Sequence, residues 1–217
     1  MNNNSAQVAQ QAHRKHEQDN AVSGAPNLKA VAGLYRFCAQ SMKFPEEHWF
    51  TRDYVDCLYQ LLENIGGLEQ KKELERVFAR PVLPLEELQI EYTRLFINGS
   101  PHVVAPPYAS VYLDKSLQGQ TTEKINSFYG SRGFSMREDS DLPDHIVHQL
   151  EFLALLTESG DQESESLFLT QMFFPWFRLF APRVVQESQH PFYRIVVQII
   201  DYFTKEEDEN GIQGIEA

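Results

Sequence analysis

The sequence predicts an all-α fold, a compact bundle of many helices around one core. From Leu28 onward, apolar residues recur at three- and four-residue spacing through most of the chain, as in helices that bury one side. No sustained alternation of apolar and polar residues indicates a strand, and no Asn-Gly turn joins two β-branched runs. With 217 residues, of which 42% are hydrophobic and 12% aromatic, the chain is long enough for one large core.

Four helices are predicted in the first part of the bundle, and proline or glycine separates most of them. Phe44-Pro45 ends the first helix, because a residue before proline disfavours the helical conformation. Gly66-Gly67 ends the second, and Pro84 suits the first turn of the fourth. The predicted ranges are 28–43, 46–64, 68–79 and 84–96.

An irregular segment, 97–108, with one glycine and three prolines, separates these helices from the rest. Short helices are predicted over 109–114 and 121–131, and longer ones over 143–158, 162–174, 175–187 and 191–203, three of which begin at a proline. The polar, turn-rich stretch 133–142 is the predicted hinge. Helical folds with such a hinge can exchange halves between protomers, so a monomer with some domain-swapped dimer is expected.

The two ends are predicted to lie outside the single helical domain, which spans residues 28–205. Residues 1–27 contain no Leu, Ile, Phe, Tyr or Trp, so they are expected to form a disordered tail. Residues 206–217 are expected to form a loose C-terminal tail. The N-terminal segment lacks the apolar region of an export signal, and no apolar run reaches the roughly 18 residues of a membrane span. We therefore expect a cytoplasmic protein.

The charge balance disfavours one class of function. Nineteen Lys and Arg face 31 Asp and Glu, a net charge of −12. Nucleic-acid binding requires a basic face, and no cluster of basic residues supplies one, whereas an acidic protein suits cationic partners. Cys38 and Cys57 are too few for a disulfide framework or a cysteine zinc site, so free thiols are expected.

No catalytic motif is present: the chain has no GxSxG, GxGxxG, phosphate-binding loop or HExxH sequence. One group of residues has metal-binding chemistry. If the predicted helix begins at Pro143, then Asp144, His148 and Glu151 share one face, but no second matching set completes a two-metal site. The alternative is that Asp144 satisfies free N–H groups at the start of a helix.

The irregular segment is unusually apolar for a loop, since it contains Pro106, Pro107 and Tyr108 and leads to Tyr112. Together with the helix end at Tyr92, Leu95 and Phe96 it suits the lining of a groove that takes an apolar ligand. A buried loop that caps the core is an equally good interpretation.

Three blocks, in this order and spacing, resemble the TorD/DmsD family of chaperones, also called redox enzyme maturation proteins. Residues 91–96 (EYTRLF) resemble its aromatic-x-x-Leu-Phe motif, residues 106–112 (PPYASVY) its Pro-Pro-aromatic-x-Ser-Val-Tyr segment, and residues 142–152 (LPDHIVHQLEF) its Pro-Asp-His-Ile…Leu-Glu-Phe signature. The resemblance covers roughly residues 28–203. Gln149 departs from an expected glutamate, and Ala109 stands where Glu or Gly is common.

The resemblance implies an all-helical, non-enzymatic, cytoplasmic chaperone without a cofactor of its own. Such a chaperone binds the twin-arginine signal peptide, or the apo form, of a molybdoenzyme of the TMAO/DMSO reductase type, and holds it until the molybdenum cofactor is inserted. An apolar groove with an acidic rim would fit the basic and apolar regions of that signal. Weak guanine-nucleotide binding, proposed within this family, stays open.

The predicted signal-binding residues line an apolar cleft, with Asp144 and His145 at its rim, where Asp144 would meet an arginine. For Leu95 and Phe96 a plain core position is the alternative. Other functions left open are a metal-dependent or nucleotide-binding helical protein, and a chaperone of the mature enzyme that ignores the signal. The predicted set is Tyr92, Leu95, Phe96, Pro106, Pro107, Tyr108, Tyr112, Asp144, His145, Glu151 and Phe152.

Overall fold

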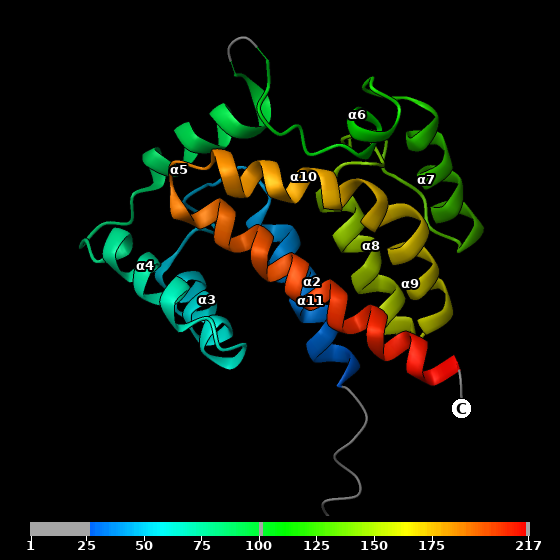
Figure 1. The fold of residues 1–217 in the computed structure, drawn as a ribbon, viewed down its shortest axis with the longest axis horizontal. Helices are drawn as coiled ribbons and strands as arrows, with labels where there is room; N and C mark the ends of the chain where they lie inside the picture. The colour runs from blue at the N-terminus through cyan, green and yellow to red at the C-terminus, as the bar shows by residue number, and fades with distance from the viewer. Residues whose placement is uncertain (1–26, 100–101, 216–217) are drawn as a thin grey trace, which may run out of the picture.

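The computed structural model describes residues 27–99 and 102–215 and confirms the all-α prediction (Figure 1). Among the described residues the only extended pairing is one isolated antiparallel bridge between Tyr108 and His145. None of the described helices is both long enough and apolar enough to cross a membrane. The α-helices are α2 (Leu28–Ser41), α3 (Arg52–Asn64), α4 (Leu68–Phe78), α5 (Leu85–Tyr92), α6 (Ala109–Leu113), α7 (Gln120–Ser131), α8 (Ile146–Ser159), α9 (Gln162–Phe168), α10 (Phe174–Glu187) and α11 (Pro191–Ile215), and two π-helical turns are η1 (Thr93–Ile97) and η2 (Leu169–Phe173).

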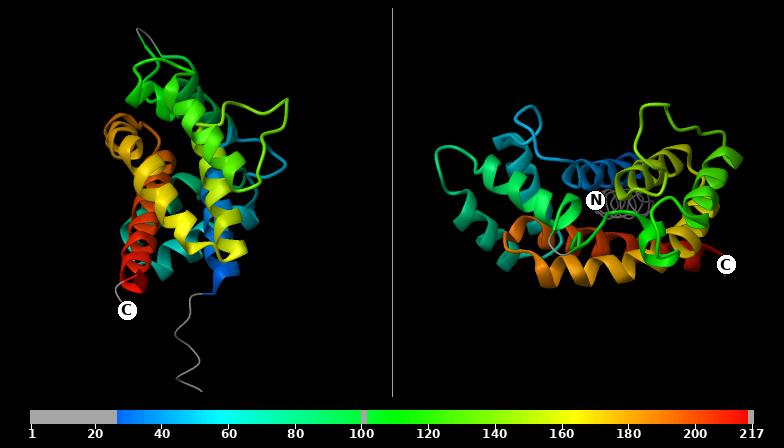
Figure 2. Two further views of the ribbon diagram at one scale, coloured as in Figure 1. Left: turned by 90° about the vertical axis from the view of Figure 1, so that its right-hand side faces the viewer. Right: turned by 90° about the horizontal axis from the view of Figure 1, so that it is seen from above.

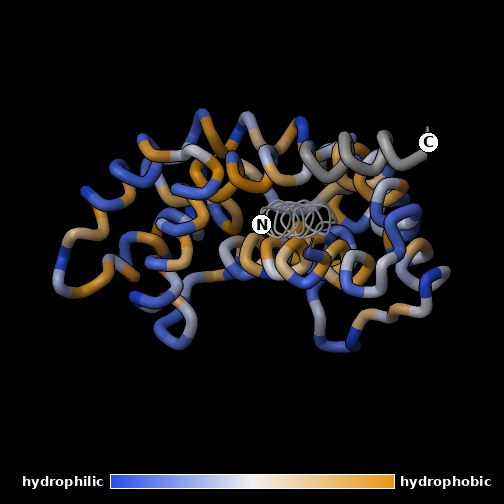
Figure 3. The backbone as a smooth tube through the Cα atoms, turned by 90° about the horizontal axis from the view of Figure 1, so that it is seen from below, coloured by the Kyte–Doolittle hydropathy of each residue, from blue (hydrophilic) through white to orange (hydrophobic). Residues whose placement is uncertain are grey.

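The long helices form two layers (Figure 2). α2 packs along α8 in one layer, and α10 packs along α11 in the other. α3, α4 and α5 lie at one end of these layers, while α6, α7 and α9 lie at the other (Figure 1). One continuous core joins them, and its largest side chains, such as Trp176, Tyr35 and Tyr193, are fully buried. Hydrophobic and hydrophilic stretches alternate along the helices, as expected for helices that bury one side (Figure 3).

Two loops, 42–51 and 132–145, project from the same side of the molecule, beside the layer of α2 and α8 (Figure 2). α10 and α11 lie on the opposite side of the molecule, and we call the side with loops 42–51 and 132–145 the loop face. The predicted hinge, 133–142, forms most of the second loop. Its Phe134 packs edge-on against Phe152 of α8, with ring centroids 5.4 Å apart, which attaches the loop to the core.

Three predicted helix boundaries were wrong. α3 begins at Arg52 and not at Glu46, because the Thr51 side chain caps it by accepting a hydrogen bond from the Tyr54 N–H. α8 begins at Ile146 and not at Pro143, and His145 is its cap. α11 continues to Ile215, where a helix end near residue 203 and a loose tail were expected. Lys205, Glu206 and Glu207 favour a helix by propensity after the apolar pattern has ended, whereas Asn210, Gly211 and Gly214 do not.

The predicted helices 162–174 and 175–187 form one continuous helical segment, α9–η2–α10. Pro175 lies in the first turn of α10, directly after the π-helical turn η2, so the helix continues through this proline. Gly160, with φ of +73°, ends α8 in the left-handed conformation that favours glycine. The tail predicted over residues 1–27 lies almost wholly outside the described residues.

Candidate functional site

The second and third sequence blocks meet in space. The Ile146 N–H donates to the Pro107 carbonyl at 2.9 Å, and the Ala109 N–H donates to the Asp144 carbonyl at 3.1 Å. These two bonds flank the bridge between Tyr108 and His145 and join the start of α6 to the start of α8. We call the paired segments 106–110 and 141–148 the junction.

Asp144 holds the junction together from inside. Its carboxylate is fully buried and accepts hydrogen bonds from the Ser110 N–H at 2.8 Å and the Thr122 hydroxyl at 2.9 Å. The prediction that Asp144 caps a helix was right in kind, but the helix is α6 and not α8. The prediction that it lies at a rim facing an arginine was wrong, since both of its oxygens are already engaged inside the protein.

Gln149 extends this network, and its hydrogen bonds explain why an amide suits this position, where the family resemblance led us to expect a glutamate. Its amide nitrogen donates to the Asp144 carbonyl at 2.7 Å, and its amide oxygen accepts from the Trp176 indole N–H at 3.1 Å. An ionised glutamate at this buried position has no N–H to donate to that carbonyl. The amide thus ties the junction to α10 through Trp176.

Tyr108 and His145, of which His145 is only 7% exposed, form an aromatic pair in the junction. Their rings meet edge-on with centroids 4.9 Å apart, and the half-buried Tyr108 hydroxyl donates to Asp141 at 2.9 Å. Burial, and then the nearby Asp141 carboxylate, raise the pKa of Tyr108 well above its usual value. The 132–145 loop thereby places an exposed carboxylate beside an aromatic pair.

His145 is neutral at pH 7, because burial lowers its pKa to about 4. Its Nδ1 accepts a hydrogen bond from the Val147 N–H at 3.2 Å, so the ring proton resides on Nε2. The imidazole is therefore a neutral hydrogen-bond donor with a fixed tautomer.

A charged group lies next to this pair, on α8. Glu151 accepts from Lys43 at 2.8 Å and lies 3.5 Å from Nδ1 of His148, whose ring centroid is 6.0 Å from that of His145. The hydrogen bond to His148, and then that to Lys43, lower the pKa of Glu151 to about 2 against the opposing effect of burial. Glu151 thus links the end of α2 to α8 as a carboxylate.

The structure does not support the alternative of a metal site formed by Asp144, His148 and Glu151. Asp144 precedes α8 and its carboxylate reaches toward α6 and α7, so it does not share a helix face with His148 and Glu151. Across residues 27–99 and 102–205, no three His, Cys, Asp or Glu side chains are grouped to hold a metal ion.

The first sequence block lies mainly in the core. Leu95 is fully buried, and the Phe96 ring, 4% exposed, packs edge-on against Tyr193 with centroids 5.3 Å apart. Tyr92 is 7% exposed and packs edge-on against the exposed ring of Phe44, 5.4 Å away. Burial, and then the charge of Asp141, raise the pKa of Tyr92 to about 12. Of this block, only Tyr92 lies near the surface of the junction.

The remaining predicted residues divide between the junction and the core. Pro107 is buried and Pro106 half-buried within the junction. Tyr112 faces α10 instead, packing edge-on against Phe180 at 6.1 Å. Phe152 belongs to an aromatic group of the core with Phe128, Tyr129, Phe134 and Phe168.

Sequence reasoning missed Asp141, which belongs to the junction, and also Lys43 and Phe44, which contact Glu151 and Tyr92. Phe44-Pro45 was interpreted only as a helix end, and Asp141 only as part of a polar loop. Spacing along the chain does not bring the end of α2 next to α8. Only the packing of these two helices does.

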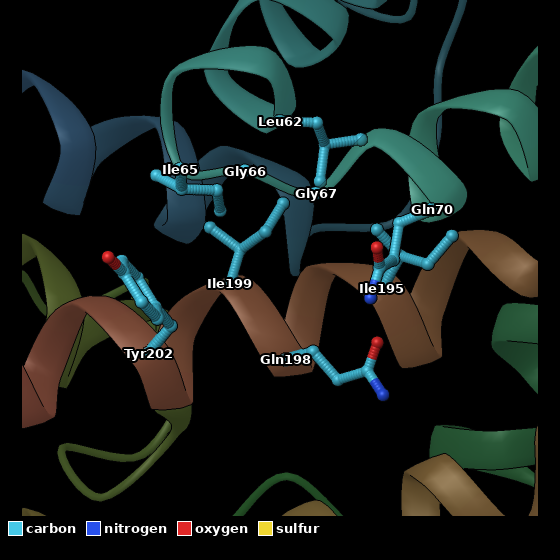
Figure 4. A pocket seen from close by; sticks show the side chains of 9 residues that line it. All are labelled: Leu62, Ile65, Gly66, Gly67, Gln70, Ile195, Gln198, Ile199 and Tyr202. Atoms are coloured by element: carbon cyan, nitrogen blue, oxygen red, sulfur yellow. The ribbon is translucent and has the colours of Figure 1, made fainter.

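A separate pocket of about 220 Å³ lies between the α3–α4 turn and α11, outside the predicted site (Figure 4). Leu62, Ile65 and Ile199 give it apolar walls, and Gln70, Gln198 and Tyr202 add polar groups around them.

Comparison with known proteins relates this arrangement to chaperones. The family model described as nitrate reductase delta subunit matches residues 65–182, which is 118 of the 217 residues. The chaperone protein TorD of Vibrio cholerae (El Tor strain N16961) is 29% identical over 166 residues, covering 66% of this chain and 75% of the relative. TorD of Actinobacillus succinogenes is 28% identical over 147 residues, covering 65% and 76%.

A crystal structure of an Archaeoglobus fulgidus protein assigned to the redox enzyme maturation proteins is also similar. It has a TM-score of 0.56 and 29% identity, and the likeness covers 81% of this chain and 91% of that one. The relatives are named as chaperones and not as enzymes. The chain therefore belongs to the TorD-like nitrate reductase delta subunit family, as a chaperone of redox enzyme maturation.

Proposed function

We propose that this protein binds the twin-arginine signal peptide of a molybdoenzyme of the TMAO/DMSO reductase type at the junction. It holds the apo form of that enzyme in the cytoplasm until the molybdenum cofactor is inserted. The single observation that carries the proposal is the Tyr108–His145 pair with Asp141 beside it. This pair offers an aromatic surface, a neutral N–H donor and a carboxylate within one small area.

The charges of the loop face support a basic ligand. The 132–145 loop carries Glu138, Asp139 and Asp141 against Arg132 and Arg137, and the 42–51 loop carries Glu46 and Glu47 against Lys43. Both loops project from one side (Figure 2). The basic start of a twin-arginine signal would be attracted to these carboxylates, and its apolar region would contact Phe44 and Tyr108.

The magnitudes fit reversible holding. Burying one Leu- or Phe-sized side chain contributes about 1.5 to 3 kcal/mol. Ordering each peptide residue costs about 1 to 2 kcal/mol of backbone entropy. Exposed pairs between arginine and carboxylate add about 0 to 1 kcal/mol each. A net binding free energy near −8 kcal/mol corresponds to a micromolar Kd, which suits a chaperone that must release its client.

Calorimetric titration with synthetic twin-arginine signal peptides of several molybdoenzymes, each beside a scrambled control, tests this proposal. We expect selective micromolar binding that Asp141→Asn weakens about fivefold. Asp56→Asn is the matched control, because it removes the same charge from an exposed carboxylate on α3, outside both loops of the loop face. Absence of selective binding by every peptide would contradict the proposal. Binding to an apo reductase that lacks its signal would then favour a chaperone of the mature enzyme.

A further inference from the structure

The outer face of α10 has a composition unlike that of the rest of this acidic protein. Residues 174–186 contain two arginines and no carboxylate, and the helix reaches its first acidic residue at Glu187. Pro175, Leu179, Pro182 and Gln186 are all exposed and follow one another at intervals of four, three and four residues. This spacing places them in one stripe along the solvent side of the helix. We call this stripe, with Arg178 and Arg183 at its edges, the α10 face.

The stripe is more apolar than the fold requires. Leu179 is 48% exposed, although its neighbour Phe180 is fully buried, so the helix already packs its inner side without Leu179. Pro182 lies inside the helix, where a proline removes one backbone hydrogen bond and destabilises the helix. Because Pro182 is exposed, core packing does not explain its presence. In a regular α-helix the Arg178 carbonyl would accept a hydrogen bond from the N–H of residue 182. Because Pro182 has no N–H, this carbonyl lacks that donor.

Both arginines carry charge without an acidic partner among the described residues. The Arg178 guanidinium lies over the Phe174 ring, 5.2 Å from its centroid, and Arg183 lies over the Tyr112 ring at 5.4 Å. Each is exposed, and neither belongs to an ion pair within the described part of the chain. Elsewhere, Arg36, Arg80, Arg94 and Arg194 each pair with a glutamate.

A third cation contacts the same tyrosine as Arg183. Lys115, in the turn after α6, donates to the Tyr112 carbonyl at 2.9 Å, while Arg183 covers the ring of the same tyrosine. Lys115 and Arg183 thus both contact Tyr112, where α6 packs against α10. The residue after Tyr112, Leu113, is 40% exposed and adds apolar surface there.

We propose that the α10 face, extended by Lys115, docks an acidic protein surface that presents leucine-sized apolar side chains. This assignment rests on the proposed function: the acidic surface belongs to the client apoenzyme, in the part of its chain that follows the signal peptide. Charge complementarity carries the choice of occupant, because the three cations would attract carboxylates and would repel the basic start of a twin-arginine signal. The α10 face is also opposite the loop face (Figure 2), so the client's two parts would bind at two separate sites.

The test measures the binding of the full chain to the apo forms of TMAO reductase and DMSO reductase, each produced without its signal peptide. Signal peptides are titrated in parallel. We expect the double variant Arg178→Glu/Arg183→Glu to weaken apoenzyme binding at least tenfold while the Kd for signal peptide stays unchanged. Raising the salt concentration weakens the wild-type complex with apoenzyme but has little effect on the residual binding of the variant.

Two further variants keep the result interpretable. Arg76→Glu reverses the charge of an exposed arginine on α4 and serves as the matched control, for which no change is expected. Leu179→Glu places a repelling charge in the stripe without altering either arginine, and we expect it to reproduce the loss. Thermal unfolding of each variant excludes loss of the fold.

Several outcomes would overturn the inference. The first is that the wild type binds neither apoenzyme. The second is that Arg76→Glu weakens apoenzyme binding as much as the double variant does. The third is that the double variant and Leu179→Glu both bind apoenzyme as tightly as the wild type. Binding of the wild type to vesicles of phosphatidylglycerol but to neither apoenzyme would assign the face to a membrane surface instead. A dimer that the double variant abolishes, without apoenzyme binding, would assign it to a second copy of this chain. Failure of the signal peptides alone overturns the proposed function and leaves the α10 face supported.

Discussion

The junction and the α10 face lie on opposite sides of the molecule and differ in how their charged groups are satisfied. At the junction, the Asp144 carboxylate is enclosed by donors from α6 and α7, and Tyr108 donates to Asp141. On the α10 face, Arg178 and Arg183 each lie over an aromatic ring, and neither forms an ion pair within the described part of the chain. The junction therefore contributes to the stability of the fold as well as to the binding of any ligand, whereas residues of the α10 face can be changed with little effect on the fold.

The largest expected difference in stability is between variants of two adjacent residues of α10, Leu179 and Phe180. Phe180 packs against Phe96, Tyr112, Trp176 and Phe177, so Phe180→Ala should lower the free energy of unfolding by about 3 to 5 kcal/mol. Leu179→Ala, on the exposed stripe, should change it by no more than about 0.5 kcal/mol. Urea denaturation of the two variants measures both values. A similar loss for Leu179→Ala would show that the stripe belongs to the core.

Removing the buried carboxylate of the junction should have the next largest effect. Asp144→Ala leaves the Ser110 N–H and the Thr122 hydroxyl unpaired in a buried position, so we expect a loss of about 2 to 3 kcal/mol in the free energy of unfolding. Asp139→Ala, in the exposed part of the same loop, is the control and should be near neutral. If Asp144→Ala were as stable as the control, the junction would not depend on this network.

His145 should make the junction sensitive to acid. Its pKa is lowered from 6.5 to about 4 in the folded protein, so the unfolded chain binds a proton more readily between these values. The stability that neutral His145 contributes is present above pH 6.5 and is lost as the pH falls toward 4. Burial lowers the pKa of His190 too, so wild type is compared with His145→Gln. The variant should show a flatter dependence of melting temperature on pH across this window, and an identical slope would contradict the assignment.

The arginines of the α10 face should contribute least to stability. Arg183→Ala removes one interaction with an aromatic ring, worth about 0.5 kcal/mol at an exposed site. Because no carboxylate pairs with Arg183 among the described residues, added salt should leave this difference unchanged. A larger loss at low salt that vanishes at high salt would reveal an ion pair and remove the basis for an acidic partner.

Much of the fold was predictable because helix ends and helix faces are local properties. The end of α2 before Pro45 and the glycines after α3 followed from single residues whose conformations are restricted. The start of α8 was not predictable in this way. Pro143 satisfies the usual rule for a first helical turn, but Pro143 and Asp144 lie in a turn that the His145 N–H closes by donating to the Leu142 carbonyl at 3.0 Å. The pairing with residues 107–109 then keeps His145 extended, so α8 begins only at Ile146. That pairing is between segments distant in sequence, so spacing could not reveal it.

The candidate site was predictable in part for the same reason. The blocks around Tyr108 and His145 were singled out, and the structure brings them together. Leu95 and Phe96 have the same apolar character as groove residues, and burial alone distinguishes them from such residues. Lys43 and Asp141 escaped notice because their place at the junction depends on the packing of α2 against α8 and on the course of a loop.

Nuclear magnetic resonance titration of the isotopically labelled full chain with a twin-arginine signal peptide tests the central claim most directly. We predict that the peptide perturbs the backbone resonances of residues 42–47, 107–110 and 139–148, and leaves those of residues 175–186 unchanged. Perturbation confined to residues 175–186, or no perturbation by any of several signal peptides at concentrations well above micromolar, would contradict the account.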